Sequence, residues 1–296
     1  FSDYSRSRLQ CWLRDGAILV DGKAALAKTR VDGGERVVLG SHATVVTEKP
    51  VRAQAIDLAV VYEDPHLLVI DKPANFVMHP AVGNREGTVQ NALLHWDPAL
   101  SEVPRSGIVH RLDKDTTGLC VVARNLAAHK CLVEQLQTRC VSREYEAIVC
   151  GVPVSGGTVD APLGRHRVDR KKMALRTDGK SAITHFRVRE KFAAHAQLSV
   201  KLETGRTHQI RVHMASQRLP LLGDPLYGGR LRLPRGADDV LIATLQGFNR
   251  QALHAARLGL QHPISGEFMQ WESPLPADMS ALIACLRTHK ETEALR

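Results

Sequence analysis

Short apolar segments with the length and composition of β-strands recur along most of the chain, and they limit the folds that it can adopt. Two of these segments, at residues 58–63 and 66–72, flank Asp64 and Pro65 as a predicted hairpin. Six further strands are predicted at residues 118–124, 143–150, 183–190, 197–203, 252–260 and 268–272. Helical patterns are fewer and fall at residues 88–96, 126–137 and 276–292. This order predicts an α+β protein in which a few helices flank a mostly antiparallel sheet.

The beginning of the chain has a different pattern, which predicts a small module. Apolar residues share one side of a predicted helix at residues 4–13, which also carries Arg6 and Arg8. A strand then enters an Asp-Gly turn before Lys23, and another short strand follows at residues 37–39. The pattern resembles the alpha-L RNA-binding module of small-subunit ribosomal proteins, which implies that these three cationic side chains bind RNA. A charged surface extension without that role is the alternative.

These patterns divide the chain into an RNA-binding module at residues 1–47, a linker at residues 48–55 and one large domain at residues 56–296. The linker is predicted because Pro50 ends strand pairing and the small polar residues after it offer little surface to bury. Because the first residue is Phe rather than Met, we expect the natural module to begin earlier, with a helix that is missing from this sequence.

The charge of the chain favours a polyanionic partner. Its 40 Lys and Arg residues outnumber its 31 Asp and Glu residues, for a formal net charge of +9. Each phosphate that a cationic side chain neutralises releases counterions, so nucleic acid is the first candidate and a membrane surface the second. No run approaches the roughly 18 consecutive apolar residues of a membrane-spanning helix, and no signal-like leader opens the chain. We therefore expect a cytoplasmic protein.

The spacing of cysteines and histidines indicates no metal site. The six cysteines include no Cys-x-x-Cys pair. Among the histidines, His110, His208 and His213 lack the spacing that places two ligands on one helical face. We therefore expect no metal ion.

A turn at residues 110–119 carries the most reactive arrangement in the chain. It sets the carboxylate of Asp113 between the cationic side chains of Arg111 and Lys114. Apolar runs that look like buried strands flank the turn, so a rigid scaffold would direct Asp113 outward. Such an arrangement is typical of an active site. The alternative is a turn whose Asp and Thr side chains satisfy only local backbone groups.

The sequence His-Arg-Leu-Asp at residues 110–113, followed by Thr-Thr-Gly at residues 116–118, resembles the signature of the pseudouridine synthases, within the branch that modifies ribosomal RNA. The other recurring segments of that family have counterparts, in the same order, at residues 69–73, 143–147 and 202–213. Residues 77–80 and 91–95 look most like the large-subunit type of the family. The resemblance covers most of residues 56–275, and four motifs in order are far more specific than any one of them.

The resemblance implies an enzyme that isomerises specific uridines of large-subunit (23S) ribosomal RNA to pseudouridine without a cofactor. It also implies a long curved mixed sheet with the active cleft across its middle. The implied partner is ribosomal RNA within, or on its way to, the large ribosomal subunit. We further expect a monomer that binds no membrane.

The same resemblance implies roles for four residues of the cleft. Asp113 is expected to be the nucleophile, which either attacks the sugar anomeric carbon or assists formation of a glycal. Arg211 is expected to keep that carboxylate ionised, and Arg111 to help displace the target base. Tyr145 is expected to stack on the flipped uracil and to take part in removing its C5 proton. For Arg211 the alternative is a structural ion pair, and for Tyr145 it is ordinary core packing.

Three more residues near the cleft have predicted roles. Thr207 is expected to cap a helix that directs Arg211 into the cleft. His110 and Lys72 are expected to bind substrate, although for Lys72 a lysine that merely ends a strand is nearly as well supported.

Two arginine-rich segments at a distance from Asp113 are predicted to grip RNA phosphates. Such contacts supply salt-sensitive affinity rather than base specificity. Solvated charge on ordinary hairpins is the alternative. The residues concerned are Arg165, Arg167, Arg170, Lys171, Lys172, Arg230 and Arg232.

Three other functions fit parts of the same pattern. A pseudouridine synthase for another RNA would keep every motif. A non-catalytic RNA-binding or ribosome-assembly protein would keep the fold without needing Asp113. A hydrolase would use Asp113 and Asp115 as an acid and base pair, which requires roughly 5 to 10 Å between the two carboxyl groups.

Overall fold

The computed structural model describes residues 6–40, 51–81 and 83–294. The chain folds as two compact units, Phe1–Pro50 and Val51–Arg296. Residues 51–55, which we expected to be part of a linker, instead pack on the second unit. The backbone amide of Gln54 donates to the carbonyl of Asn91, whose side chain in turn donates to the carbonyl of Arg52.

The first unit is a helix followed by a three-stranded antiparallel sheet. Helix α1 (Arg6–Arg14) precedes strands β1 (Ile18–Val20), β2 (Lys23–Ala24) and β3 (Val37–Leu39), in the order β2-β1-β3. Trp12, Ala17 and Ile18 form its buried core. The predicted helix and Asp-Gly turn are both present. Lys23 is exposed, whereas the side chains of Arg6 and Arg8 lie outside the described residues.

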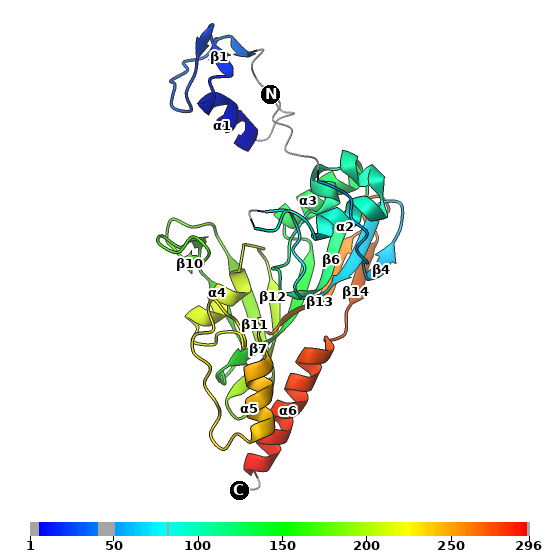
Figure 1. Cartoon of the computed structure of the whole chain (residues 1–296), viewed down its shortest axis with the longest axis vertical. Helices are drawn as coiled ribbons and strands as arrows, with labels where there is room; N and C mark the ends of the chain where they lie inside the picture. The colour runs from blue at the N-terminus through cyan, green and yellow to red at the C-terminus, as the bar shows by residue number, and fades with distance from the viewer. Residues whose placement is uncertain (1–5, 41–50, 82, 295–296) are drawn as a thin grey trace. The chain divides into compact units, whose positions relative to one another are not determined.

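The second unit is built on a nine-stranded sheet that runs across its centre (Figure 1). Its strand order is β4-β5-β6-β13-β7-β12-β11-β8, and β14 pairs with β13. The strands are β4 (Val60–Glu63), β5 (Leu67–Lys72), β6 (Thr117–Ala123), β7 (Ser142–Cys150), β8 (Gly157–Asp160), β11 (Ile183–Lys191), β12 (His195–Leu202), β13 (Leu253–Gln261) and β14 (Phe268–Glu272). Every pair is antiparallel except β6 with β13. The predicted α+β class with a mostly antiparallel sheet is therefore confirmed.

Helices pack around this sheet. They are α2 (Val89–Trp96), α3 (Leu126–Gln137), α4 (Gln209–Ser216), α5 (Asp239–Gly247) and α6 (Ala277–Ala294), with short 3-10 helices η1 (Pro98–Glu102) and η2 (Pro104–Gly107). Figure 1 shows α5 and α6 side by side near the C-terminus. The side chain of Asn125 caps α3 by accepting a hydrogen bond from the amide of Ala128. No helix in the described part of the chain is both long enough and apolar enough to cross a membrane.

Several elements were not predicted from the sequence. They include strand β8, helix α5 and the 3-10 helices η1 and η2. A hairpin outside the main sheet, formed by β9 (Leu163–Arg165) and β10 (Met173–Leu175), was not predicted either. This hairpin carries the first of the arginine-rich segments.

Successive side chains of a strand point to opposite faces of the sheet, so the buried residues of one strand belong to separate cores. Leu68 and Ile70 of β5 pack in one core together with α2, whereas Leu67 and Val69 pack in another together with α3. Strand β7 follows the same rule, so Tyr145 faces the first of these cores. The pattern fixes which side chains of β7 can reach the cleft.

The parallel pair depends on Gly118. This residue opposes Ala255 of β13 and has φ +108°, in the left-handed region that favours glycine. A Cβ atom at this position would lie 2.3 Å from the backbone oxygen of Ala255. Glycine therefore allows β6 and β13 to approach, and this contact fixes the end of the loop that carries Asp113.

Candidate active site

A cavity of about 730 Å³ opens on the second unit. Its lining comes from the loop before β6, from β7, from the end of α3 and from the turn that leads into α4. The predicted cleft residues found in that lining are His110, Arg111, Asp113, Tyr145 and Arg211. The fold thus brings together five residues that are spread over about a hundred positions of the chain.

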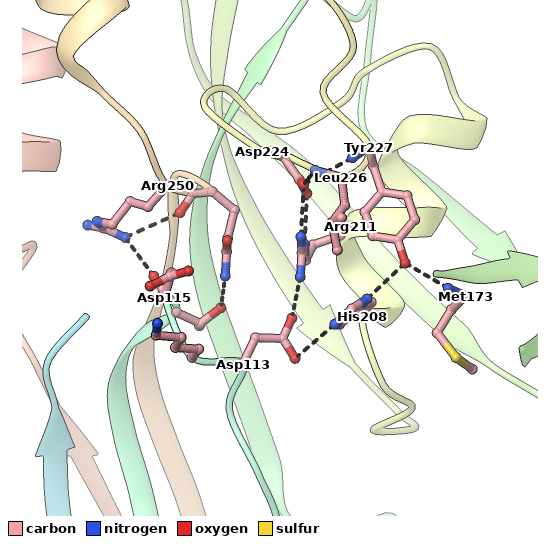
Figure 2. Close-up of polar contacts among 12 residues, drawn as sticks. Asp113, Asp115, Met173, His208, Arg211, Asp224, Leu226, Tyr227 and Arg250 are labelled. Carbon is pink, nitrogen blue, oxygen red and sulfur yellow. Dashed lines mark hydrogen bonds and ion pairs between the residues drawn. The ribbon is translucent and has the colours of Figure 1, made fainter. Parts of the chain in front are cut away.

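Asp113 and Arg211 are in direct contact. An Nη1 hydrogen of Arg211 is donated to Oδ2 of Asp113 at 3.1 Å (Figure 2). The Asp113 side chain retains 16% of its exposed surface, and its backbone oxygen accepts a hydrogen bond from the amide of Thr116. The loop is therefore held at its backbone while its carboxylate remains open to the cavity.

Asp224, which was not predicted from the sequence, holds Arg211 in place. Arg211 donates from Nε and Nη2 to the two carboxylate oxygens of Asp224, at 2.7 and 2.8 Å. The Asp224 side chain is fully buried and also accepts from the amides of Leu226 and Tyr227. This bidentate grip leaves Nη1 of Arg211 directed at Asp113.

Both members of this buried pair remain charged. Burial alone would lower the pKa of Arg211, but its hydrogen bonds and charge interactions, first with Asp224 and then with Asp113, raise it above its usual value. For Asp224 burial opposes ionisation, yet the hydrogen bond and charge of Arg211 bring its pKa below the usual range. A permanent positive charge therefore lies against Asp113.

The N-terminal cap predicted at Thr207 is wrong. Helix α4 begins at Gln209, and its N-cap is His208 with φ 55° and no side-chain capping bond. This left-handed residue turns the imidazole toward the cavity, where its Nε2 lies 3.9 Å from Oδ1 of Asp113. Helix α4 thus begins one residue later than predicted, and Asp113 gains His208 as a neighbour.

A hydrogen-bond chain fixes the His208 ring (Figure 2). Its Nδ1 lies 2.8 Å from the hydroxyl oxygen of Tyr227, which also accepts from the amide of Met173 in β10 at 2.8 Å. The Asp113 carboxylate beside Nε2 favours the tautomer that carries its proton there, in which the Tyr227 hydroxyl donates to Nδ1. Burial lowers the pKa of His208, which favours the neutral ring. The neutral ring then carries its proton on Nε2, facing Asp113.

Tyr145 and Arg111 occupy different depths of the cavity. Tyr145 on β7 is 7% exposed, and burial raises its pKa to about 12, so its hydroxyl remains protonated at neutral pH. That hydroxyl has no hydrogen-bond partner within the described ranges. Arg111 is exposed at the rim.

His110 and Lys72 have structural partners that the sequence did not reveal. His110 lines the cavity, but its Nε2 accepts from the amide of Val121 at 3.0 Å, and burial lowers its pKa to about 3. Lys72 is 1% exposed and does not line the cavity. Its ammonium group donates to the carbonyls of Pro73 and Lys114. Through the Lys114 carbonyl, Lys72 supports the loop that carries Asp113, and its role in binding substrate stays a prediction.

The proposed acid and base pair of a hydrolase is absent from the cavity. Asp115 does not belong to the lining, although Asp113 does. The backbone oxygen of Asp115 accepts from Arg250, which is paired with Asp278. The loop is therefore held in place through the backbone of Asp115, and the Asp115 side chain does not supply a second carboxylate to the cavity.

The arginine-rich segments lie on exposed loops. In the β9–β10 hairpin Arg165 donates to the carbonyl of Arg170, and Lys172 is half-buried 3.9 Å from Asp169. The exposed cations of the two segments are Arg165, Arg167, Arg170, Lys171, Arg230 and Arg232. Their binding to RNA stays a prediction. The amide of Met173 connects the first segment to Tyr227 and so to the cavity.

Comparison with known proteins identifies the family of this chain. Residues 66–216 match the family model of RNA pseudouridylate synthases. The chain belongs to this family and is an enzyme that acts on RNA. The family predicted from the motifs is thereby confirmed.

Two relatives match nearly the whole chain. A protein of Pseudomonas aeruginosa named ribosomal large subunit pseudouridine synthase D is 56% identical over 291 residues, which cover 98% of this chain and 90% of that protein. The Escherichia coli protein of the same name is 52% identical over 292 residues, covering 98% of this chain and 89% of its own. The solved structure of human RNA pseudouridylate synthase domain containing 4 is 26% identical, with a TM-score of 0.60 over 77% of this chain and 93% of that one.

Proposed function

We propose that this enzyme converts specific uridines of large-subunit (23S) ribosomal RNA into pseudouridine, with Asp113 as the nucleophile. The observation that carries the assignment of Asp113 is its 3.1 Å contact with Arg211 inside the cavity. The choice of ribosomal RNA rests on the relatives, which are named large-subunit synthases and match nearly the full chain.

The reaction breaks the bond between N1 of uracil and C1′ of ribose, turns the base and joins its C5 to C1′. An ionised carboxylate can attack C1′ directly or assist formation of a glycal. Arg211 serves either route because its charged hydrogen bond holds the Asp113 carboxylate in place in the cavity. The second carboxylate that fixes Arg211, Asp224, is turned away from Asp113 by its own hydrogen bonds.

Tyr145 and Arg111 handle the base in this proposal. The Tyr145 ring offers an aromatic surface in the cavity on which a flipped uracil can stack, and its neutral hydroxyl is free of other partners in the described chain. Arg111 reaches from the rim and helps displace the base from its RNA stack. Extrusion costs a few kcal/mol, least where the nucleotide is already in a loop.

The exposed cations supply the remaining affinity. Lys23 of the first unit and the arginine-rich segments of the second bind RNA phosphates without selecting a base. The partner is ribosomal RNA within, or on its way to, the large ribosomal subunit, and the enzyme works in the cytoplasm as a monomer.

The test is tritium release from ribosomal RNA that carries tritium at uridine C5, with a chelator present and the modified positions mapped. We expect release without strand cleavage from wild type, none from Asp113→Ala, and near-normal release from Asp115→Asn. The last variant is a matched control because Asp115 lies on the same loop outside the cavity lining. Release from transfer RNA alone would reassign the substrate. No release from free ribosomal RNA, precursor subunits or mature subunits, despite tight salt-sensitive binding, would leave a non-catalytic RNA-binding protein.

A further inference from the structure

Arg143 is a buried cation that lines the cavity without a carboxylate. It is 6% exposed and lies on β7 two residues before Tyr145, so both side chains project from the same side of the strand. One hydrogen bond holds its guanidinium, from Nη2 to the backbone oxygen of Glu203 at 3.3 Å. Its Nε is buried with no partner in the described part of the chain.

The other buried arginines are paired. Arg211 contacts Asp113 and Asp224, and Arg250 contacts Asp278 at 2.6 Å. Arg143 has no ion pair with any described residue. Glu203, whose backbone oxygen accepts the hydrogen bond from Arg143, directs its carboxylate to Arg139 and His185 instead.

A buried guanidinium of this kind is poised for an acceptor from outside the protein. It has five N–H donors in a fixed plane, and burying them without acceptors is unfavourable. Burial lowers the pKa of Arg143, and no neighbouring carboxylate opposes that effect. The charge thus faces the cavity uncompensated.

Gly205 makes the room for this group. A Cβ atom at position 205 would lie 2.5 Å from Nη1 of Arg143, so any other residue would displace the guanidinium. Gly205 lines the same cavity. Its φ lies outside the left-handed region, so the backbone itself does not require glycine here. Glycine at position 205 therefore leaves free the space that the Arg143 guanidinium occupies.

We propose that Arg143 binds an anionic oxygen of the target nucleotide inside the cavity. This inference rests on the proposed function, and it names the part of the substrate that the cation meets. Two anionic oxygens are available: a carbonyl oxygen of the uracil once the base has left the sugar, and a phosphate beside the target nucleotide.

The chemistry of the reaction favours the uracil. When the N1–C1′ bond breaks, its electron pair leaves with the base, which then carries one negative charge spread over N1, O2 and O4. That charge disappears when C5 bonds to C1′, C5 loses its proton and N1 gains one. Both routes open to Asp113 generate the same anion. A donor beside Tyr145 stabilises this charge as it develops during cleavage of the bond, which lowers the barrier without tightening the binding of intact RNA.

The test compares wild type, Arg143→Met and Arg143→Lys in single-turnover tritium release, and measures RNA binding over a salt series in the Asp113→Asn background. Arg257→Met is the matched control, because Arg257 is paired with Glu144 and Glu272 and does not line this cavity. If the uracil anion is the ligand, Arg143→Met slows turnover about 100-fold or more with unchanged RNA affinity, and Arg143→Lys recovers part of the rate. If a phosphate is the ligand, affinity falls, and the slope of log affinity against log salt drops by about one.

Unchanged turnover and unchanged salt dependence in a folded Arg143→Met variant would overturn the inference. If that variant fails to fold, Gly205→Ala replaces it, because it displaces the guanidinium without removing its charge. We expect Gly205→Ala to reproduce the defect, and wild-type behaviour in it would count against the inference. Failure of the proposed function is distinguishable, since wild type itself would then release no tritium.

Discussion

Asp224 grips Arg211 through two hydrogen bonds, and the remaining amino group of Arg211 meets Asp113. The proposed nucleophile is thus positioned by a carboxylate that is itself fully shielded from solvent. Three charges in a row alternate in sign, and only Asp113 at the end of the row reaches the cavity. The buried Asp224 and Arg211 therefore set the orientation of the Asp113 carboxylate.

Asp224→Ala is expected to lower both stability and activity. It leaves Arg211 buried with one carboxylate in place of two, which should reduce the free energy of unfolding by about 3–5 kcal/mol. Urea unfolding measures this change, and tritium release measures the loss of activity. The control is Glu190→Ala, which removes the half-buried partner of the exposed Arg287 and should cost about 1 kcal/mol or less. Equal costs for the two variants would contradict the buried role of Asp224.

Tyr227→Phe is expected to release the His208 ring from its single tautomer. The variant removes the hydroxyl that donates to Nδ1 and leaves the Met173 amide without its acceptor. Nitrogen-15 chemical shifts of His208 should show the proton on Nε2 in wild type and a mixture in the variant. We expect a severalfold slower reaction with unchanged RNA affinity. A wild-type ring protonated on Nδ1 would refute the proposed hydrogen-bond direction.

Lys72 is expected to make stability rise with pH above neutrality. Burial lowers its folded pKa to about 8 from 10.5, so between these values the unfolded chain binds more protons than the folded one. The free energy of unfolding from this group therefore increases from pH 8 to pH 10.5, by at most about 3.5 kcal/mol at about 1.4 kcal/mol per unit. Denaturant unfolding should show wild type gaining on Lys72→Met across that window. A constant difference between the two would show that Lys72 titrates normally.

Arg167→Gln is expected to weaken RNA binding through the loss of one phosphate contact. Arg167 is exposed on the β9–β10 hairpin, and no hydrogen bond or ion pair holds it among the described residues. The slope of log affinity against log salt should fall by about one, uniformly for different RNA sequences. Lys290→Gln on α6 is the control, since that exposed cation lies outside the arginine-rich segments. Identical salt slopes in the two variants would favour solvated charge over phosphate binding.

Gly118→Ala is expected to disrupt the centre of the sheet. The new Cβ would meet the backbone oxygen of Ala255 at 2.3 Å, and backbone atoms cannot move aside without opening the β6–β13 pair. A loss of about 4 kcal/mol or more in the free energy of unfolding should follow. Gly266→Ala separates this collision from backbone strain, because Gly266 has φ +72° with open space around it and should cost only about 1–3 kcal/mol. Similar losses in both would show that strain, not contact, governs position 118.

Local pattern predicts the elements of this fold well because helices and strands are defined by near neighbours. The predicted bounds of α3 and β14 coincide with the structure, and both depend on periodicity within a few residues. Strand β8, the β9–β10 hairpin and α5 escape prediction because they are short and lack a clear apolar period. The cap at Thr207 fails because the left-handed turn of His208 has no capping signature.

The candidate site is predictable only where a motif carries it. Asp113 and Arg211 lie 98 positions apart, and no periodicity connects them, so their contact was expected from the family resemblance alone. Asp224 gave no such signal, being one acidic residue in a Gly-Asp-Pro turn. Lys72 was placed correctly at the end of β5, but the direction of its ammonium depends on the carbonyl of Lys114, 42 positions away.

The parallel pairing of β6 with β13 also determines when the enzyme becomes competent. The strand that follows the Asp113 loop is bounded on one side by β13, and Thr117 hydrogen-bonds to His254, 137 positions later. Arg250, which donates to the backbone oxygen of Asp115 in the loop, is translated almost as late as His254. A nascent chain emerges from its N-terminus, so the loop lacks its supports until most of the sequence has been translated. The loop that carries the proposed nucleophile can therefore gain these supports only after residue 254 has been translated, and shorter nascent chains carry the motif without them.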